Sequence, residues 1–272
     1  MPLSSLSFFM VMEFEMNDMR EFLEREAALI NRPEFIADDP VQFPRRFESL
    51  PDIEIVSLLA SAIAWGNRKM ICRDADRMLA LMDHQPYQYM MDRGYEDLDP
   101  SMNIHRTFFA RNLANFLSGM RGIYERHGSL ADFARANRVG EVEAPAWHLV
   151  ELINAELAKA TGGIHDSRCL PGNLDSTALK RVNMALRWLV RDDGIVDMGV
   201  WKGVIDPSRL YIPLDVHVGN TARSLGLLER RGNDRRAVEQ LTSVLRSMRP
   251  ADPVYYDYAL FGIGVTGKQL DK

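Results

Sequence analysis

The sequence of 272 residues predicts an all-α protein. Apolar side chains recur every three or four residues in almost every segment, which is the spacing of one face of a helix. Only the short stretch 209–213 looks extended. With 46% hydrophobic and 26% charged residues, the composition is that of a globular chain long enough to bury a full core. We therefore expect a compact helical fold.

The expected helices follow one another along the chain, each with its own apolar stripe. They cover 17–30, 53–64, 68–82, 108–124, a helix that starts after Ser129, 146–160, 176–191, 216–228, 234–248 and 253–263. Ser129 and Asp132 have the spacing of a capping pair, and Ser176 is the expected N-cap of the helix over 176–191. Residues 1–15 are expected to be disordered, because their apolar run is short and follows no basic residue.

Charge and motif content exclude several classes of function. The 33 Lys and Arg against 38 Asp and Glu give a net charge of −5, but the first 56 residues hold 12 acidic and 5 basic side chains. The rest is slightly basic, which is compatible with a local nucleic-acid surface. Cys72 and Cys169 are too far apart for a CxxC pair. The sequence has no HxxxH, Walker or GxSxG motif, and no GxGxxG that follows an expected strand. We expect a reduced cytoplasmic protein with no metal and no membrane-spanning segment.

Two features in the C-terminal half can carry chemistry. The turn Leu170-Pro171-Gly172 lies ahead of a helix, where backbone N–H groups can hold a phosphate, although an ordinary loop explains the tripeptide more simply. Lys180 is expected in the first turns of that helix, on a face shared with Arg187 and Arg191. By default this is a solvated basic face. The positive end of a helix also favours the neutral amine that a nucleophile requires.

A third feature is Asp215, which lies between apolar neighbours where the helix over 216–228 is expected to begin. The simplest interpretation is an N-cap aspartate. A capping carboxylate is also fixed in place and can face a pocket, so the structural and the functional interpretation are compatible. The nearby His217 is expected to be a hydrogen-bonded core side chain, or one that binds the DNA backbone, rather than a catalytic base.

Taken together, these residues resemble the helix-hairpin-helix DNA glycosylases, the superfamily of endonuclease III and the 8-oxoguanine glycosylases. The string Leu214-Asp215-Val216-His217-Val218, continued by 222–227, resembles the V-D-T-H-V…R-L-G-L segment that carries the catalytic aspartate of that superfamily. Leu170-Pro171-Gly172 resembles the start of its L-P-G-x-G hairpin, and 258–264 resembles its closing helix. A weaker likeness covers 53–83, which corresponds to the segment that wedges into the DNA stack.

The chain departs from the superfamily at two points. The second hairpin glycine is missing, because Asn173 and the two residues after it follow Gly172. Lys180 precedes Asp215 by 35 positions, a longer interval than usual, which is similar to the archaeal 8-oxoguanine glycosylase branch. The chain is also similar to a widespread bacterial family related to these glycosylases. Without the four cluster cysteines, it is expected to hold no iron–sulfur cluster and no other cofactor.

The resemblance implies two helical lobes with a DNA-binding cleft between them. Residues 16–104 and 216–272 would form one lobe, and residues 105–215 would form the lobe with the helix-hairpin-helix element. The implied site residues are Lys180 and Asp215 for catalysis, Gly172, Asn67, Arg68, His217 and Arg223 for DNA contacts, and Trp65 for the base pocket. Trp188 and Trp201 are further candidates for stacking on the base.

The implied activity is that of a DNA repair glycosylase and AP lyase. It would act as a monomer on double-stranded DNA, flip out a damaged base such as 8-oxoguanine, and attack C1′ of its sugar with Lys180. Two alternatives stay open. In a monofunctional glycosylase, Asp215 would activate water and Lys180 would only contact phosphate. A non-catalytic helix-hairpin-helix module would bind DNA or RNA without cleaving a bond.

Overall fold

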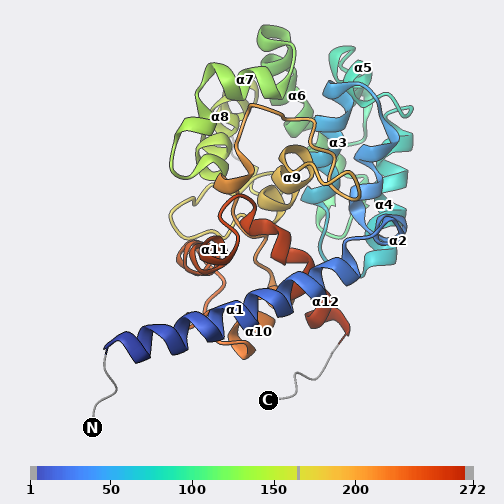
Figure 1. The fold of residues 1–272 in the computed structure, drawn as a ribbon. Coiled ribbons are helices and arrows are strands. Elements are labelled where there is room, and N and C mark those ends of the chain that lie inside the picture. The colour runs from blue at the N-terminus through green and yellow to red at the C-terminus, as the bar shows by residue number, and fades with distance from the viewer. Residues whose placement is uncertain (1–4, 164–165, 267–272) are drawn as a thin grey trace.

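Figure 1 shows the computed structural model of the chain, which describes residues 5–163 and 166–266. The α-helices are α1 (Ser5–Ile30), α2 (Pro33–Asp38), α3 (Leu50–Ala62), α4 (Arg68–Leu81), α5 (Pro86–Met91), α6 (Ala110–His127), α7 (Leu130–Ala136), α8 (Pro145–Ala160), α9 (Lys180–Val190), α10 (Val216–Ser224), α11 (Arg235–Met248) and α12 (Asp257–Thr266). Short 3₁₀ helices are η1 (Pro40–Gln42), η2 (Pro44–Arg46), η3 (Gly94–Asp97), η4 (Val139–Glu141), η5 (Pro207–Arg209) and η6 (Pro253–Tyr256). The strands β1 (Asn103–His105) and β2 (Phe108–Phe109) form a small antiparallel pair.

The predicted all-α class is confirmed, and several helices begin at a side-chain cap. Ser129 accepts a hydrogen bond from the backbone N–H of Asp132 at 2.9 Å, as its spacing predicted. Asn67 caps α4 in the same way. The pair β1–β2 was not expected. The stretch 209–213, expected to be extended, begins with the last residue of η5 and continues towards α10 without forming a strand.

The predicted start of α9 is wrong by four residues. Leu179 has φ 48° and ψ 33°, a left-handed conformation that cannot belong to the helix, so α9 begins at Lys180. Ser176 does not cap it. Instead, the carbonyl of Ser176 accepts a hydrogen bond from the backbone N–H of Arg235, and Thr177 forms a bridge with Asp234. This pairing with the start of α11 is a tertiary contact that apolar spacing does not encode.

The helices pack in two groups that differ from the expected division of the chain. Helix α1 packs along α12, which packs on α10, and these helices lie together in the lower part of Figure 1. Helix α3 packs against α9, α6 packs against α8, and α5 contacts α6. Most of residues 33–104 therefore pack with residues 105–215. Of the N-terminal helices, mainly α1 packs with the C-terminal ones. The finer division into lobes around a DNA cleft belongs to the proposal below.

The N-terminal region also differs from the expectation. Helix α1 begins at Ser5, so it includes 5–15, which were expected to be disordered, while residues 1–4 lie outside the described part. Within residues 5–163 and 166–266, no helix combines the length and the apolar character needed to cross a membrane.

Candidate active site

A pocket of about 990 Å³ opens where the end of α3 meets the first residues of α4, α9 and α10 and the last part of α12. This volume lies within the range of small-molecule sites. Five of the eight predicted site residues line it, namely Trp65, Arg68, Lys180, Asp215 and His217. The structure therefore brings together residues from three segments that are far apart in the sequence.

Lys180 is the first residue of α9 and is half-buried in the pocket wall. Its Nζ donates a hydrogen bond to the carbonyl of Ala64 at 3.4 Å, just beyond the end of α3. The next residue, Arg181, donates to the carbonyl of Ala62 at 2.5 Å. Carbonyl groups at a helix C-terminus lack helical partners and carry partial negative charge, so they attract both cations. This contact fixes the start of α9 against α3.

Trp65 forms a half-buried wall of the same pocket. Its indole ring lies 5.3 Å from the guanidinium of Arg181 and makes an edge contact with the ring of His105, at 4.8 Å between centroids. His105 is fully buried and bonds the Trp65 carbonyl through Nε2 at 3.0 Å and Asp74 through Nδ1 at 2.8 Å. Burial works to raise the pKa of Asp74, but hydrogen bonds from His105 and Arg73 outweigh it, and the pKa is lowered. The buried pair His105–Asp74 thus fixes the position of Trp65 on the side away from the pocket.

Asp215 is the N-cap of α10, as predicted, and it also lines the pocket. Its Oδ1 accepts a hydrogen bond from the backbone N–H of Val218 at 2.9 Å. Its carbonyl accepts one from Asn233 at 3.0 Å. Because only one carboxylate oxygen caps the helix, the half-buried side chain keeps acceptor capacity on the pocket side. His217 is exposed, so of its two expected roles the core one is wrong.

The other predicted DNA contacts lie outside the pocket lining. Asn67 is exposed and caps α4 by accepting from the backbone N–H of Met70 at 3.2 Å. Gly172 is exposed in the segment between α8 and α9. Arg223 is bound within the protein, because its guanidinium donates to the carbonyl of Arg230 at 2.8 Å and to Asn233 Oδ1 at 2.6 Å. Arg223 therefore supports the loop that holds Asp215. Trp188 and Trp201 are fully buried core residues.

Sequence reasoning missed Asp39, a second carboxylate in the pocket. It is 7% exposed, and burial raises its pKa. Its Oδ1 accepts a hydrogen bond from the backbone N–H of Val41 at 3.1 Å, and its Oδ2 lies 3.7 Å from Arg68 Nη2. In the sequence, Asp39 follows an aspartate and precedes a proline, which is typical of a surface turn. No local signal distinguishes it from its exposed neighbour Asp38.

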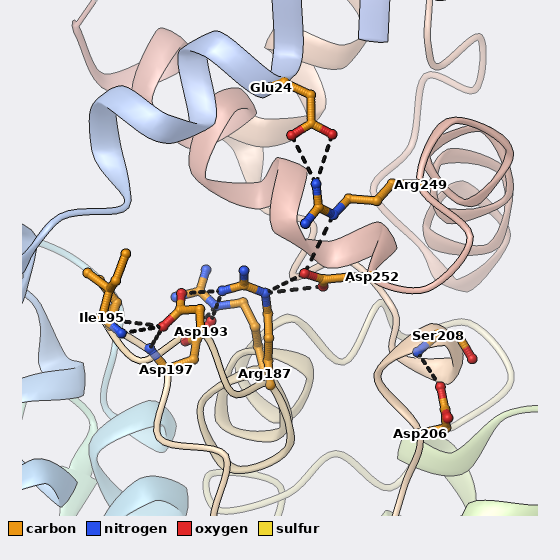
Figure 2. Close-up of polar contacts among 11 residues, drawn as sticks. Glu24, Arg187, Asp193, Ile195, Asp197, Asp206, Ser208, Arg249 and Asp252 are labelled. Carbon is orange, nitrogen blue, oxygen red and sulfur yellow. Dashed lines mark hydrogen bonds and ion pairs between the residues drawn. The ribbon is translucent and has the colours of Figure 1, made fainter. Parts of the chain in front are cut away.

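Two buried arginines, one in α9 and one at its C-cap, correct the expectation of a solvated basic face. Arg187 and Arg191 are each 4% exposed. Both bond Asp197, at 3.2 and 2.8 Å, and Arg187 also pairs with Asp257 at the start of α12. The network continues through Asp252 and Arg249 to Glu24 of α1, and Figure 2 shows this part of it together with Asp197.

The buried network is electrostatically coupled to the pocket. Burial raises the pKa of Asp257 to about 6, because its pairing with Arg187 only partly offsets the loss of solvation. The charge of Asp215 raises the pKa further, and the charge of Lys180 lowers it. Lys180 and Asp215 therefore act on the same buried carboxyl from the pocket side.

The charged groups around the pocket suit an anionic ligand better than a metal ion. Arg68, Arg168, Lys180 and Arg181 line it together with the carboxylates of Asp39 and Asp215. Among the described residues, no three His, Cys, Asp or Glu side chains are grouped so that they could hold a metal ion. The arrangement offers an amine, two carboxylates and an aromatic wall within one recess.

A family model described as a protein of unknown function, DUF2400, matches residues 39–266. No curated protein and no solved structure matches the chain. The matched range starts at Asp39 and includes every residue that lines the pocket.

Proposed function

The chain belongs to the DUF2400 family, and from the residues of the pocket we propose that it is a DNA glycosylase with AP-lyase activity that excises 8-oxoguanine. One observation carries the proposal. Lys180 and Asp215, which are 35 positions apart in the sequence, line the same pocket as the aromatic wall Trp65. A nucleophilic amine, a carboxylate and a stacking surface are the groups that excision of a flipped base requires.

In the proposed reaction, the damaged nucleotide rotates out of the duplex into the pocket, because C1′ is inaccessible inside the stack. The neutral amine of Lys180 forms a bond to C1′ while the N-glycosidic bond breaks, and the bonding electron pair and a proton leave with the base. Asp215 stabilises the positive charge that develops on the sugar. Opening of the sugar ring gives a Schiff base, and loss of a proton from C2′ then expels the 3′ phosphate.

The surroundings of the pocket support a DNA substrate. Arg168 and Arg181 add positive charge to its lining, and phosphate contacts depend on such local charge rather than on the net charge of −5. Asn67, Gly172 and His217 are exposed near its rim or in the adjoining segments. We assign these three to contacts with the DNA backbone, and Arg223 to support of the loop beneath. The two lobes and the helix-hairpin-helix element remain part of this proposal.

The first prediction is a covalent adduct that depends on Lys180. Purified protein is incubated with duplexes carrying 8-oxoguanine or an abasic site, in the presence of borohydride, which reduces a Schiff base to a stable bond. We expect a trapped complex with the wild type and none with Lys180→Gln. Peptide mass spectrometry should place the adduct on Lys180.

The matched control is Lys159→Gln, which changes a 70% exposed lysine on α8 and should leave trapping unchanged. Excision of the base without any adduct would support the monofunctional alternative, in which Asp215 activates water. Salt-dependent DNA binding without excision across a panel of damaged bases would support a non-catalytic module. Absence of binding and of excision would contradict all three.

A further inference from the structure

A carboxylate, a guanidinium and an aromatic ring lie next to one another in the pocket lining, namely those of Asp39, Arg68 and Phe261. Asp39 lies beside Arg68, and Arg68 lies over the ring of Phe261 at 5.1 Å to the centroid. All three line the pocket, together with Trp65 and Ile71. This face therefore combines aromatic and aliphatic surface with one acceptor group and one donor group. Such a combination is typical of a site that holds a flat, polar-edged ligand.

Asp39 has unused acceptor capacity. Among the described residues, its one hydrogen-bond donor is the backbone N–H of Val41, on Oδ1. Oδ2 faces Arg68 Nη2 at 3.7 Å, which is beyond hydrogen-bond distance. Each carboxylate oxygen can accept two hydrogen bonds. A buried carboxylate that is only partly satisfied gains most from a ligand that donates hydrogens to it, because leaving it unmatched is costly.

Arg68 is held in place by aromatic contacts rather than by hydrogen bonds. Its guanidinium lies 5.7 Å from the centroid of Phe35 and 5.1 Å from that of Phe261. Within the described part of the chain, none of its N–H groups donates a hydrogen bond, and the side chain is 37% exposed. The ring contacts thus orient the guanidinium, and its N–H groups remain able to donate hydrogen bonds to a ligand.

We propose that Asp39 and Arg68 read the hydrogen-bonding edge of the flipped base, so that the pocket selects a guanine-type base. This inference rests on the proposed glycosylase function. Guanine-type bases carry two adjacent N–H donors, on N1 and on the exocyclic amine, which match the carboxylate of Asp39. Their neighbouring carbonyl matches the guanidinium of Arg68. An adenine-type base presents a ring acceptor where guanine has N1–H, and this acceptor would face the carboxylate unfavourably.

The experiment compares three duplexes under single-turnover conditions. They carry 8-oxoguanine, 8-oxoadenine, which has the same C8 oxygen but the other edge, or an abasic site, which has no base to read. We expect the wild type to favour 8-oxoguanine over 8-oxoadenine. In Asp39→Asn, the rate of 8-oxoguanine excision should fall by about 100-fold or more. The amide N–H₂ replaces one acceptor oxygen, and it would face an N–H donor of the base. Borohydride trapping at the abasic site should stay within about twofold of wild type.

The matched control is Asp38→Asn, which changes the exposed neighbour and should alter neither excision nor trapping. Equal excision of 8-oxoguanine by Asp39→Asn and wild type would overturn the inference. So would a wild-type preference for 8-oxoadenine. An equal loss of Asp39→Asn on 8-oxoguanine and on the abasic site would also overturn it, because that pattern indicates a structural role in the turn Pro40–Gln42. Failure of wild-type trapping at the abasic site would instead overturn the proposed lysine chemistry.

Discussion

The carboxylate of Asp215 caps α10 through Val218 and, in the proposed reaction, also faces the positive charge on the sugar. Asparagine caps a helix as well as aspartate does, but it carries no charge. Asp215→Asn should therefore keep the free energy of unfolding within about 0.5 kcal/mol of wild type while excision slows by about 100-fold. Urea unfolding and single-turnover excision measure the two effects separately.

A second N-cap provides the matched control for this separation. Asp234 caps α11 by accepting from the backbone N–H of Ala237 at 3.0 Å, and it does not line the candidate pocket. Asp234→Ala should lower the free energy of unfolding by about 1 kcal/mol and leave excision unchanged. If Asp215→Asn instead destabilised the protein as much as Asp234→Ala and kept full activity, Asp215 would be a structural cap alone.

Sequence reasoning identified some pocket residues and missed others for a physical reason. Asp215 lies in a distinctive string of residues at a helix start, and Lys180 lies near the start of the preceding helix, so both were predicted and both line the pocket. Asp39 reaches the same pocket from the turn before Pro40, 141 positions before Lys180. Nothing in the local pattern of that turn specifies what it will pack against.

At the scale of elements, apolar spacing located most helices but not their exact ends or their buried charges. Helix α4 was expected at 68–82 and covers Arg68–Leu81. Helix α9 starts later than expected, because the preceding residues pair with the start of α11. Arg187 and Arg191 follow the same spacing as solvated residues would, so only their partners Asp197 and Asp257 reveal that they are buried.

Glu54 joins elements in a similar way within the core. This fully buried carboxylate of α3 accepts hydrogen bonds from Tyr124 of α6, from the first two backbone N–H groups of α7, and from Trp201, at 2.8 to 2.9 Å. In Glu54→Gln, an amide N–H₂ group replaces one of the two carboxylate oxygens. This group would face N–H or O–H donors that now bond to the carboxylate. We expect the free energy of unfolding to fall by about 3 kcal/mol in urea denaturation.

The matched control for this substitution is Glu125→Gln. Glu125 of α6 forms an ion pair with Arg121 one turn away, at 2.7 Å, and its side chain is 43% exposed. Removing such a surface pair should change the free energy of unfolding by less than about 0.5 kcal/mol. Equal and small effects of both substitutions would show that α3, α6 and α7 do not depend on the buried carboxylate.

At the scale of the whole molecule, a chain of ion pairs, buried at Arg187 and Arg191 and partly exposed at Arg249, joins the two groups of helices. Arg187 of α9 pairs with Asp257 of α12, and Arg191 bonds Asp252 just before it at 2.9 Å. Arg249 then bonds Glu24 of α1 at 2.9 Å. These contacts lead from the helix that carries Lys180 to both terminal helices, and Figure 2 shows the branch through Asp252 and Arg249 to Glu24. Apolar periodicity describes each helix by itself, so the expectation that N- and C-terminal segments share a lobe came from the resemblance and not from this pattern.

The network also makes the stability of the protein depend on pH in a defined window. Burial raises the pKa of Asp257 from 3.8 to about 6, so the folded state binds its proton more tightly than the unfolded state does. The contribution of this group to stability is therefore greatest below pH 3.8. It is lost as the pH rises through about 6, and it is constant from about pH 7 upward. A difference of this size corresponds to about 3 kcal/mol.

Asp257→Asn removes this titration and keeps a side chain of similar size. The difference is the free energy of unfolding of wild type minus that of Asp257→Asn. We expect this difference to fall by about 2 kcal/mol between pH 4 and 6.5, and to stay level from pH 7 to 8. Urea unfolding of both proteins at each pH measures the difference. A difference that rises with pH across the same window would show that attraction to Arg187 outweighs the cost of burial. The ion pair would then hold α9 to α12 most strongly at neutral pH.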